Sequence, residues 1–231
     1  MPPTPTIEAR PLARRPGRGC PRAVLASALA ACLVASLGLF AARALWAQAA
    51  SGPSRLTGPE KKQLATIALE PVLAALEGRA PRTPSVGQRL NARQPLVVSM
   101  YLDGKLLARS WELARPGPLA GQAMLLSASM LDSPNYGNAP DPAVLSRVKV
   151  GVGVFYRFKE IKDETGLGDG EGVVVMNGFK EGVALPNDLP QGYKPQELLS
   201  FASQTGGMRP GAWLLPEATL LCAVVDEEIL Q

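Results

Sequence analysis

Apolar residues recur every three or four positions in three parts of the chain, which is the spacing of a helix that buries one face. The first part begins at Thr57, where Thr-x-x-Glu has the spacing of a capping box, and Pro71 is expected to kink it. The second covers residues 119–130. The third runs from near Pro195 to Gly206, since glycine commonly ends a helix. The pattern therefore predicts about three helices.

Alternation of apolar and other residues predicts strands elsewhere. It is clearest over residues 148–158, where the valines and Phe158 alternate with Gly151 and Gly153. Asp103-Gly104 and Asn177-Gly178 are two-residue hairpin signals, because such turns need positive φ. We therefore expect an α+β fold over residues 57–231, an antiparallel β-sheet flanked by about three helices, as one unit or two lobes. The remaining strands are expected at residues 96–102, 105–111, 173–176, 179–185 and 218–225.

The N-terminal part of the chain predicts export. An arginine-rich region, residues 1–22, precedes an uninterrupted apolar run at residues 23–42, and residues 47–49 (Ala-Gln-Ala) resemble a signal-peptide cleavage site. Residues 23–49 are thus a cleaved signal peptide or, because about 20 apolar residues can cross a bilayer, a membrane anchor. Acylation at Cys32 is a third interpretation, although the residues after it stay apolar. Residues 50–56 are a linker.

All of these interpretations place the domain outside the cytoplasm, in the periplasm or anchored in the inner membrane of a bacterium. Without the export segment, Cys222 is the only cysteine, and the chain has no histidine. Because it has no histidine, the chain cannot form a Ser-His-Asp triad or a His-ligated metal site, and we expect no metal and no cofactor. The net charge of +4 comes mostly from the export segment, and nucleic-acid binding is not expected.

Glycine-rich motifs near the C-terminus resemble those of the AMMECR1 domain. In that family a His-Gly strand, a Gly-rich hairpin ending in Leu-Leu-Pro, a helix, and Lys-Ala-Gly-Leu before Ala-Trp follow one another. The order of elements upstream matches more loosely, over nearly all of the exported part. The resemblance implies the same α+β fold. The motifs here are residues 170–175 (Gly-Glu-Gly-Val-Val-Val), 178–186 (Gly-Phe-Lys-Glu-Gly-Val-Ala-Leu-Pro), 206–208 (Gly-Gly-Met) and 211–213 (Gly-Ala-Trp).

The chain departs from the family at its most characteristic residues. Aligned on Gly104, the family's Arg-Gly-Cys-Ile-Gly falls on residues 107–111, so that Arg109 replaces the cysteine, and Ser110 and Trp111 follow it. Glu171 stands where the family has histidine. Arginine cannot act as a thiolate nucleophile or metal ligand, so chemistry that needs this cysteine is excluded. We expect no catalytic residue and assign a ligand site to Arg109, Ser110, Trp111 and Glu171.

Two interpretations of Arg109 and Glu171 stay open at this stage. They can form a bidentate ion pair between neighbouring strands, or they are unrelated surface charges. For function, the sequence favours a non-catalytic binding or adaptor module of the cell envelope with an unidentified protein partner, and with the membrane itself if residues 23–42 are retained. The alternatives are an enzyme or accessory protein of AMMECR1, MEMO and radical-SAM modification chemistry with a rewired site, and a structural envelope component.

Overall fold

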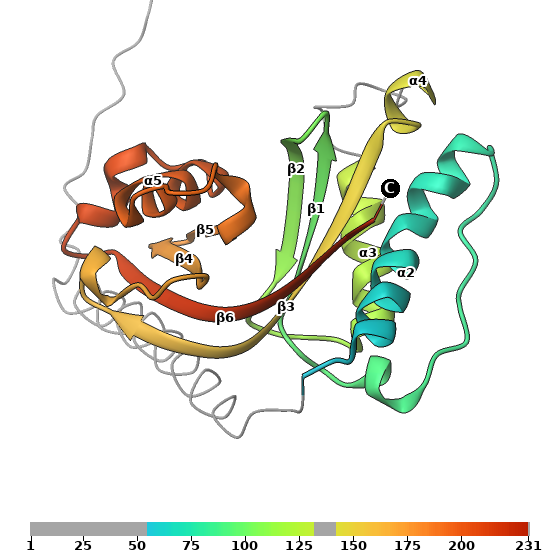
Figure 1. Cartoon of the computed structure of the whole chain (residues 1–231), viewed down its shortest axis with the longest axis horizontal. Helices are drawn as coiled ribbons and strands as arrows, with labels where there is room; N and C mark the ends of the chain where they lie inside the picture. The colour runs from blue at the N-terminus through green and yellow to red at the C-terminus, as the bar shows by residue number, and fades with distance from the viewer. Residues whose placement is uncertain (1–54, 132–141, 231) are drawn as a thin grey trace, which may run out of the picture. The chain divides into compact units, whose positions relative to one another are not determined.

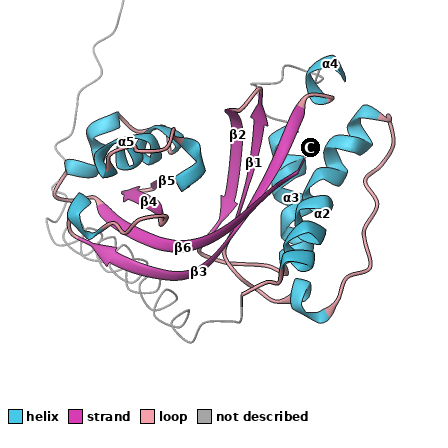
Figure 2. Cartoon of the chain, viewed as in Figure 1, coloured by secondary structure: helices cyan, strands magenta, loops and turns pink. Residues whose placement is uncertain are grey.

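Six antiparallel strands form one sheet in the computed structural model, which describes residues 55–131 and 142–230 (Figures 1 and 2). The order across the sheet is β2-β1-β3-β6-β4-β5, so β2 and β5 are its two edges. Residues 1–54, which include the predicted export segment and most of the predicted linker, residues 132–141 and residue 231 lie outside the described residues. The strands are β1 (Leu96–Leu102), β2 (Lys105–Glu112), β3 (Val148–Ile161), β4 (Gly172–Asn177), β5 (Lys180–Ala184) and β6 (Thr219–Leu230).

The two long central strands, β3 and β6, connect two of the three hydrophobic clusters that the described residues form. β1 and β2 extend one end of this pair, where α2 (Gly58–Leu76) and α3 (Leu119–Leu131) bury their apolar faces. β4 and β5 extend the other end, where α5 (Pro195–Thr205) packs on them (Figure 1). The α+β class and the three helices expected from the sequence are confirmed, and the four-residue helix α4 (Pro142–Leu145) is additional.

Helix α2 begins where its capping box predicts. The Glu60 carboxylate accepts a hydrogen bond from the backbone N–H of Thr57 at 2.8 Å, and the helix continues through Pro71. Among the described residues, no helix is both long and apolar enough to cross a membrane.

A β-bulge in β3 changes which side chains share a face. The pairing with β6 shifts between Phe155 and Arg157, so the alternation reverses there. Phe158 therefore lies with Phe155, their rings stacked 5.3 Å apart, on the face opposite Val148. Its predicted place on the valine face was wrong, because a regular period of two cannot anticipate an inserted residue.

The two hairpins use different turns. Asp103 and Gly104 have φ of 52° and 78°, as the Asp-Gly signal predicts for a type I′ turn. The second turn lies one residue later than predicted: Asn177 still belongs to β4, and Gly178, with φ of 61°, is followed by a fully exposed Phe179. Glycine at the first central position is the type II′ pattern, which needs positive φ only there.

Helix α5 and strand β5 approach each other backbone to backbone. A Cβ added at Gly182 would lie 1.9 Å from the carbonyl oxygen of Ala202, and one added at Gly206 would lie 2.5 Å from that of Glu181. Only glycine fits such an approach. These two glycines belong to the motifs singled out in the sequence, and they fix the position of α5 on the sheet.

Candidate functional site

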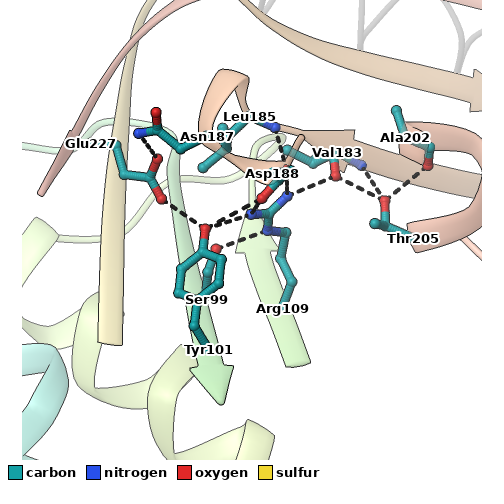
Figure 3. Close-up of polar contacts among 10 residues, drawn as sticks. All are labelled: Ser99, Tyr101, Arg109, Val183, Leu185, Asn187, Asp188, Ala202, Thr205 and Glu227. Carbon is teal, nitrogen blue, oxygen red and sulfur yellow. Dashed lines mark hydrogen bonds and ion pairs between the residues drawn. The ribbon is translucent and has the colours of Figure 1, made fainter. Parts of the chain in front are cut away.

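Arg109 points from β2 into the interior, on the sheet face opposite α2 and α3, and its side chain is only 2% exposed. All three nitrogen atoms of its guanidinium donate hydrogen bonds (Figure 3). Nε donates to the Ser99 hydroxyl at 2.8 Å, and Nη1 donates to the carbonyl oxygen of Val183 at 3.2 Å. Nη2 donates to Tyr101 at 3.2 Å and to Asp188 Oδ1 at 2.5 Å, and Nη1 also contacts Asp188 Oδ2. The guanidinium is therefore fully bonded within the protein.

Asp188 is the counter-ion of Arg109, and its side chain is completely buried. It ends the short helix η4 (Pro186–Asp188), and its carboxylate also accepts the backbone N–H of Leu185 at 2.6 Å. Burial lowers the pKa of Arg109, but the hydrogen bonds and charge of Asp188 outweigh it, and the net shift is upward. Arg109 thus stays charged, bound bidentately to one carboxylate.

A second, partly buried carboxylate completes the cluster. Glu227 of β6 accepts the Tyr101 hydroxyl at 3.0 Å and the side-chain amide of Asn187 at 2.8 Å (Figure 3). Tyr101 and Glu227 lie on strands either side of β3, and they meet over Gly151, where a Cβ would lie 3.1 Å from each. Burial raises the pKa of Glu227 and that of Tyr101. Gly151 is thus what lets this polar network cross the sheet.

Trp111 and Ser110 point to opposite sides of β2. The indole of Trp111 donates to Glu181 of β5 at 2.6 Å, and burial raises the pKa of that carboxylate. The hydroxyl of Ser110 accepts from Ser129 of α3 at 3.3 Å. Side chains of β2 therefore hold this edge strand to β5 on one face of the sheet and to α3 on the other.

The hypothetical ion pair between Arg109 and Glu171 is not formed. Glu171 accepts the backbone N–H of Gly168 at 2.8 Å, in the loop before β4, and Asp188 binds Arg109 instead. The structure thus brings Arg109, Ser110 and Trp111 together on β2 and places Glu171 elsewhere. Sequence reasoning missed Asp188, which lies 79 positions from Arg109. The sequence signal that could have pointed to Asp188 is its position in the short turn directly after Leu185-Pro186.

Cys222 is the free cysteine in β6 and is buried. Burial raises the pKa of its thiol to about 11, with a further increase from the hydrogen bond and charge of Glu171. At neutral pH it remains a thiol, which is a weak nucleophile.

An open pocket of about 390 Å³ follows β2 from Leu106 to Ser110. Its other described walls come from Ser129 and Met130 of α3 and from Thr205 of α5. Two of the predicted site residues, Arg109 and Ser110, line it, whereas Trp111 and Glu171 are not among its described lining residues. Much of its surface is polar, so it suits an occupant that makes hydrogen bonds.

Thr205, which lines this pocket, also bonds the backbone of β5, the other edge strand of the sheet. The Thr205 hydroxyl accepts the backbone N–H of Val183 at 3.0 Å and contacts the carbonyl oxygen of Val183 at 2.8 Å. These backbone groups lie on β5, and α5 therefore satisfies that edge with a side chain.

Comparisons with known proteins identify a fold and nothing finer. No protein-family model matches the chain, and no curated protein matches its sequence. Its fold is similar to the crystal structure of an uncharacterized protein, PH0010, from Pyrococcus horikoshii, with a TM-score of 0.62 and 15% sequence identity. The similarity covers 76% of this chain and 94% of that chain. At this identity it supports the α+β architecture alone.

Proposed function

We propose that the protein is an exported, AMMECR1-like binding or adaptor domain of the bacterial cell envelope that performs no chemistry of its own. The observation that carries this proposal is the polar pocket along Leu106–Ser110, which lies directly beside a guanidinium that is already fully bonded. A pocket of this size is suited to binding. The side chains around it supply hydrogen-bonding groups and no activated nucleophile.

The position of Arg109 supports the absence of catalysis. It occupies the place of the family's cysteine, and its guanidinium is bound to Asp188 in the interior. Cys222 stays protonated because burial raises its pKa to about 11. A thiol needs a neighbouring base or a lowered pKa to act as a nucleophile, and the pKa of Cys222 is raised instead. The guanidinium of Arg109 is charged and is not a nucleophile.

Two features support the remaining parts of the proposal. The arginine-rich residues 1–22 and the apolar residues 23–42 support export. Gly182 and Gly206, which carry part of the resemblance to the AMMECR1 domain, lie where α5 and β5 approach too closely for any side chain. The motif residues thus have a physical reason to be glycine in this fold.

The test is native mass spectrometry of the full-length protein purified gently from its own envelope. Ser129→Arg places a long charged side chain at the pocket wall, and Gly121→Arg adds the same charge two turns earlier on α3, where the site is open. We expect a protein partner at fixed stoichiometry on the wild type and on Gly121→Arg, and its loss from Ser129→Arg. A retained small molecule that Ser129→Arg releases would instead favour the enzyme or accessory role. A partner held equally by all three would overturn the pocket's role.

A further inference from the structure

Strand β2 has one edge that no described strand uses. It pairs with β1 along its whole length, and its order in the sheet leaves the other side unpaired. Among the described residues, the only other hydrogen bond to its backbone is from the Gln122 side chain to the carbonyl oxygen of Glu112, at its last residue. From Lys105 to Trp111 the outward N–H and C=O groups therefore lack a protein partner in the part of the chain that the structure describes.

The pocket lies along this same edge. Its lining includes five consecutive strand residues, Leu106 to Ser110, and hydroxyl-bearing Ser129 and Thr205 stand on its other walls. An edge strand presents N–H and C=O groups at every second residue, a repeat of about 7 Å. Only another extended backbone carries complementary groups at that repeat. The free charge that would select an ionic ligand is missing, because the guanidinium of Arg109 is bound to Asp188.

We propose that an extended segment of a partner protein adds as a strand to the outer edge of β2. This inference rests on the proposed binding function and specifies the partner's chemistry at the same pocket. Main-chain hydrogen bonds supply the affinity, as in other cases of strand addition. Side chains of the segment that face Ser110, Ser129 and Thr205 are small and uncharged, since these three wall residues carry no charge.

The test uses a displayed library of random linear peptides selected on the full-length protein. Selected peptides are then N-methylated at one residue at a time, because in an added strand only every second N–H of the peptide points at β2. We expect methylation at alternate residues to weaken binding about tenfold and methylation at the residues between to have little effect. Backbone amides of β2 gain protection from hydrogen exchange in the complex. Ser129→Arg weakens binding and Gly121→Arg does not.

Several results would overturn the inference. They are the selection of no peptide, a methylation profile without alternation, binding that Ser129→Arg leaves unchanged, or a β2-mediated dimer that makes a second copy the occupant. The outcome separates from that of the proposed function. An envelope partner that Ser129→Arg releases, together with a methylation profile without alternation, would reject strand addition and keep the adaptor role. An alternating methylation profile without any partner from the envelope would keep strand addition and reject the adaptor role.

Discussion

The two edge strands of the sheet, β5 and β2, are completed in opposite ways. On β5, the backbone of Gly182 lies against α5 and Thr205 bonds both polar groups of Val183. On β2, no described helix or strand bonds the outer backbone from Lys105 to Trp111, and only Gln122 of α3 reaches the last carbonyl, that of Glu112. Instead, Arg109 and Trp111 reach across to residues on or next to β5. Natural proteins usually protect an exposed edge, because it templates pairing with another chain. The contrast is consistent with the proposal that a partner strand adds to β2, while side chains keep β2 in place.

The largest expected loss of stability comes from breaking the ion pair between Arg109 of β2 and Asp188. Asp188→Ala leaves the Arg109 guanidinium buried without a counter-ion and should lower the free energy of unfolding by about 3–5 kcal/mol. Urea denaturation measures this. The double variant Arg109→Met with Asp188→Leu removes both charges and should recover much of the loss. A loss below about 1 kcal/mol for Asp188→Ala would contradict the role of the pair.

The next effect tests how β5 is closed. Gly182→Ala puts a methyl group where the carbonyl oxygen of Ala202 lies 1.9 Å away, so α5 must move off the sheet. We expect a loss of about 3 kcal/mol in the free energy of unfolding. Gly121→Ala on α3 is the control, because its added methyl group meets nothing within 4 Å, and it should be neutral or stabilising. Equal effects of the two substitutions would show that the backbone contact does not decide the position of α5.

A pair of conservative changes compares the two edges directly. Thr205→Val keeps the side-chain shape but leaves the N–H of Val183 without its acceptor, and should cost about 1–2 kcal/mol. Ser129→Ala, on the open side, removes an exposed hydroxyl and should change stability by less than about 0.5 kcal/mol. Thermal unfolding of the two variants side by side measures the difference. A larger loss of stability for Ser129→Ala than for Thr205→Val would contradict the view that the β5 edge is bonded and the β2 edge is open.

The smallest expected effect is a pH dependence from Glu227. Burial raises its pKa in the folded state, so the folded protein binds this proton more tightly than the unfolded chain does. Stability should therefore rise as the pH falls from neutral toward the ordinary pKa of a glutamate. Tyr101, Asp188 and Arg109 contribute to the field at Glu227. Glu227→Gln removes the titration, so its stability relative to the wild type should be highest at neutral pH and decline on acidification. Chemical denaturation at several pH values measures this, and a constant difference would contradict it.

Local patterns account for most of the elements. The capping box at Thr57, the helical spacing in three segments and the Asp103-Gly104 turn were sufficient for the helices and the first hairpin, because each depends on residues a few positions apart. The candidate site was predictable only in part. Arg109, Ser110 and Trp111 are neighbours on one strand, whereas Glu171, which the sequence assigned to the same site, accepts a hydrogen bond from Gly168 elsewhere.

Three features depend on contacts between distant parts of the chain, and no local pattern contains them. The bulge at Phe155 is set by the register against β6, and Asp188 meets Arg109 across 79 positions. Which edge of the sheet stays open depends on where α5 packs. The short-range preferences of this chain thus specify its helices, strands and α+β class. The ion pair, the pocket and the open edge arise only when the folded sheet brings those elements side by side, because burial and pairing partners exist only in three dimensions.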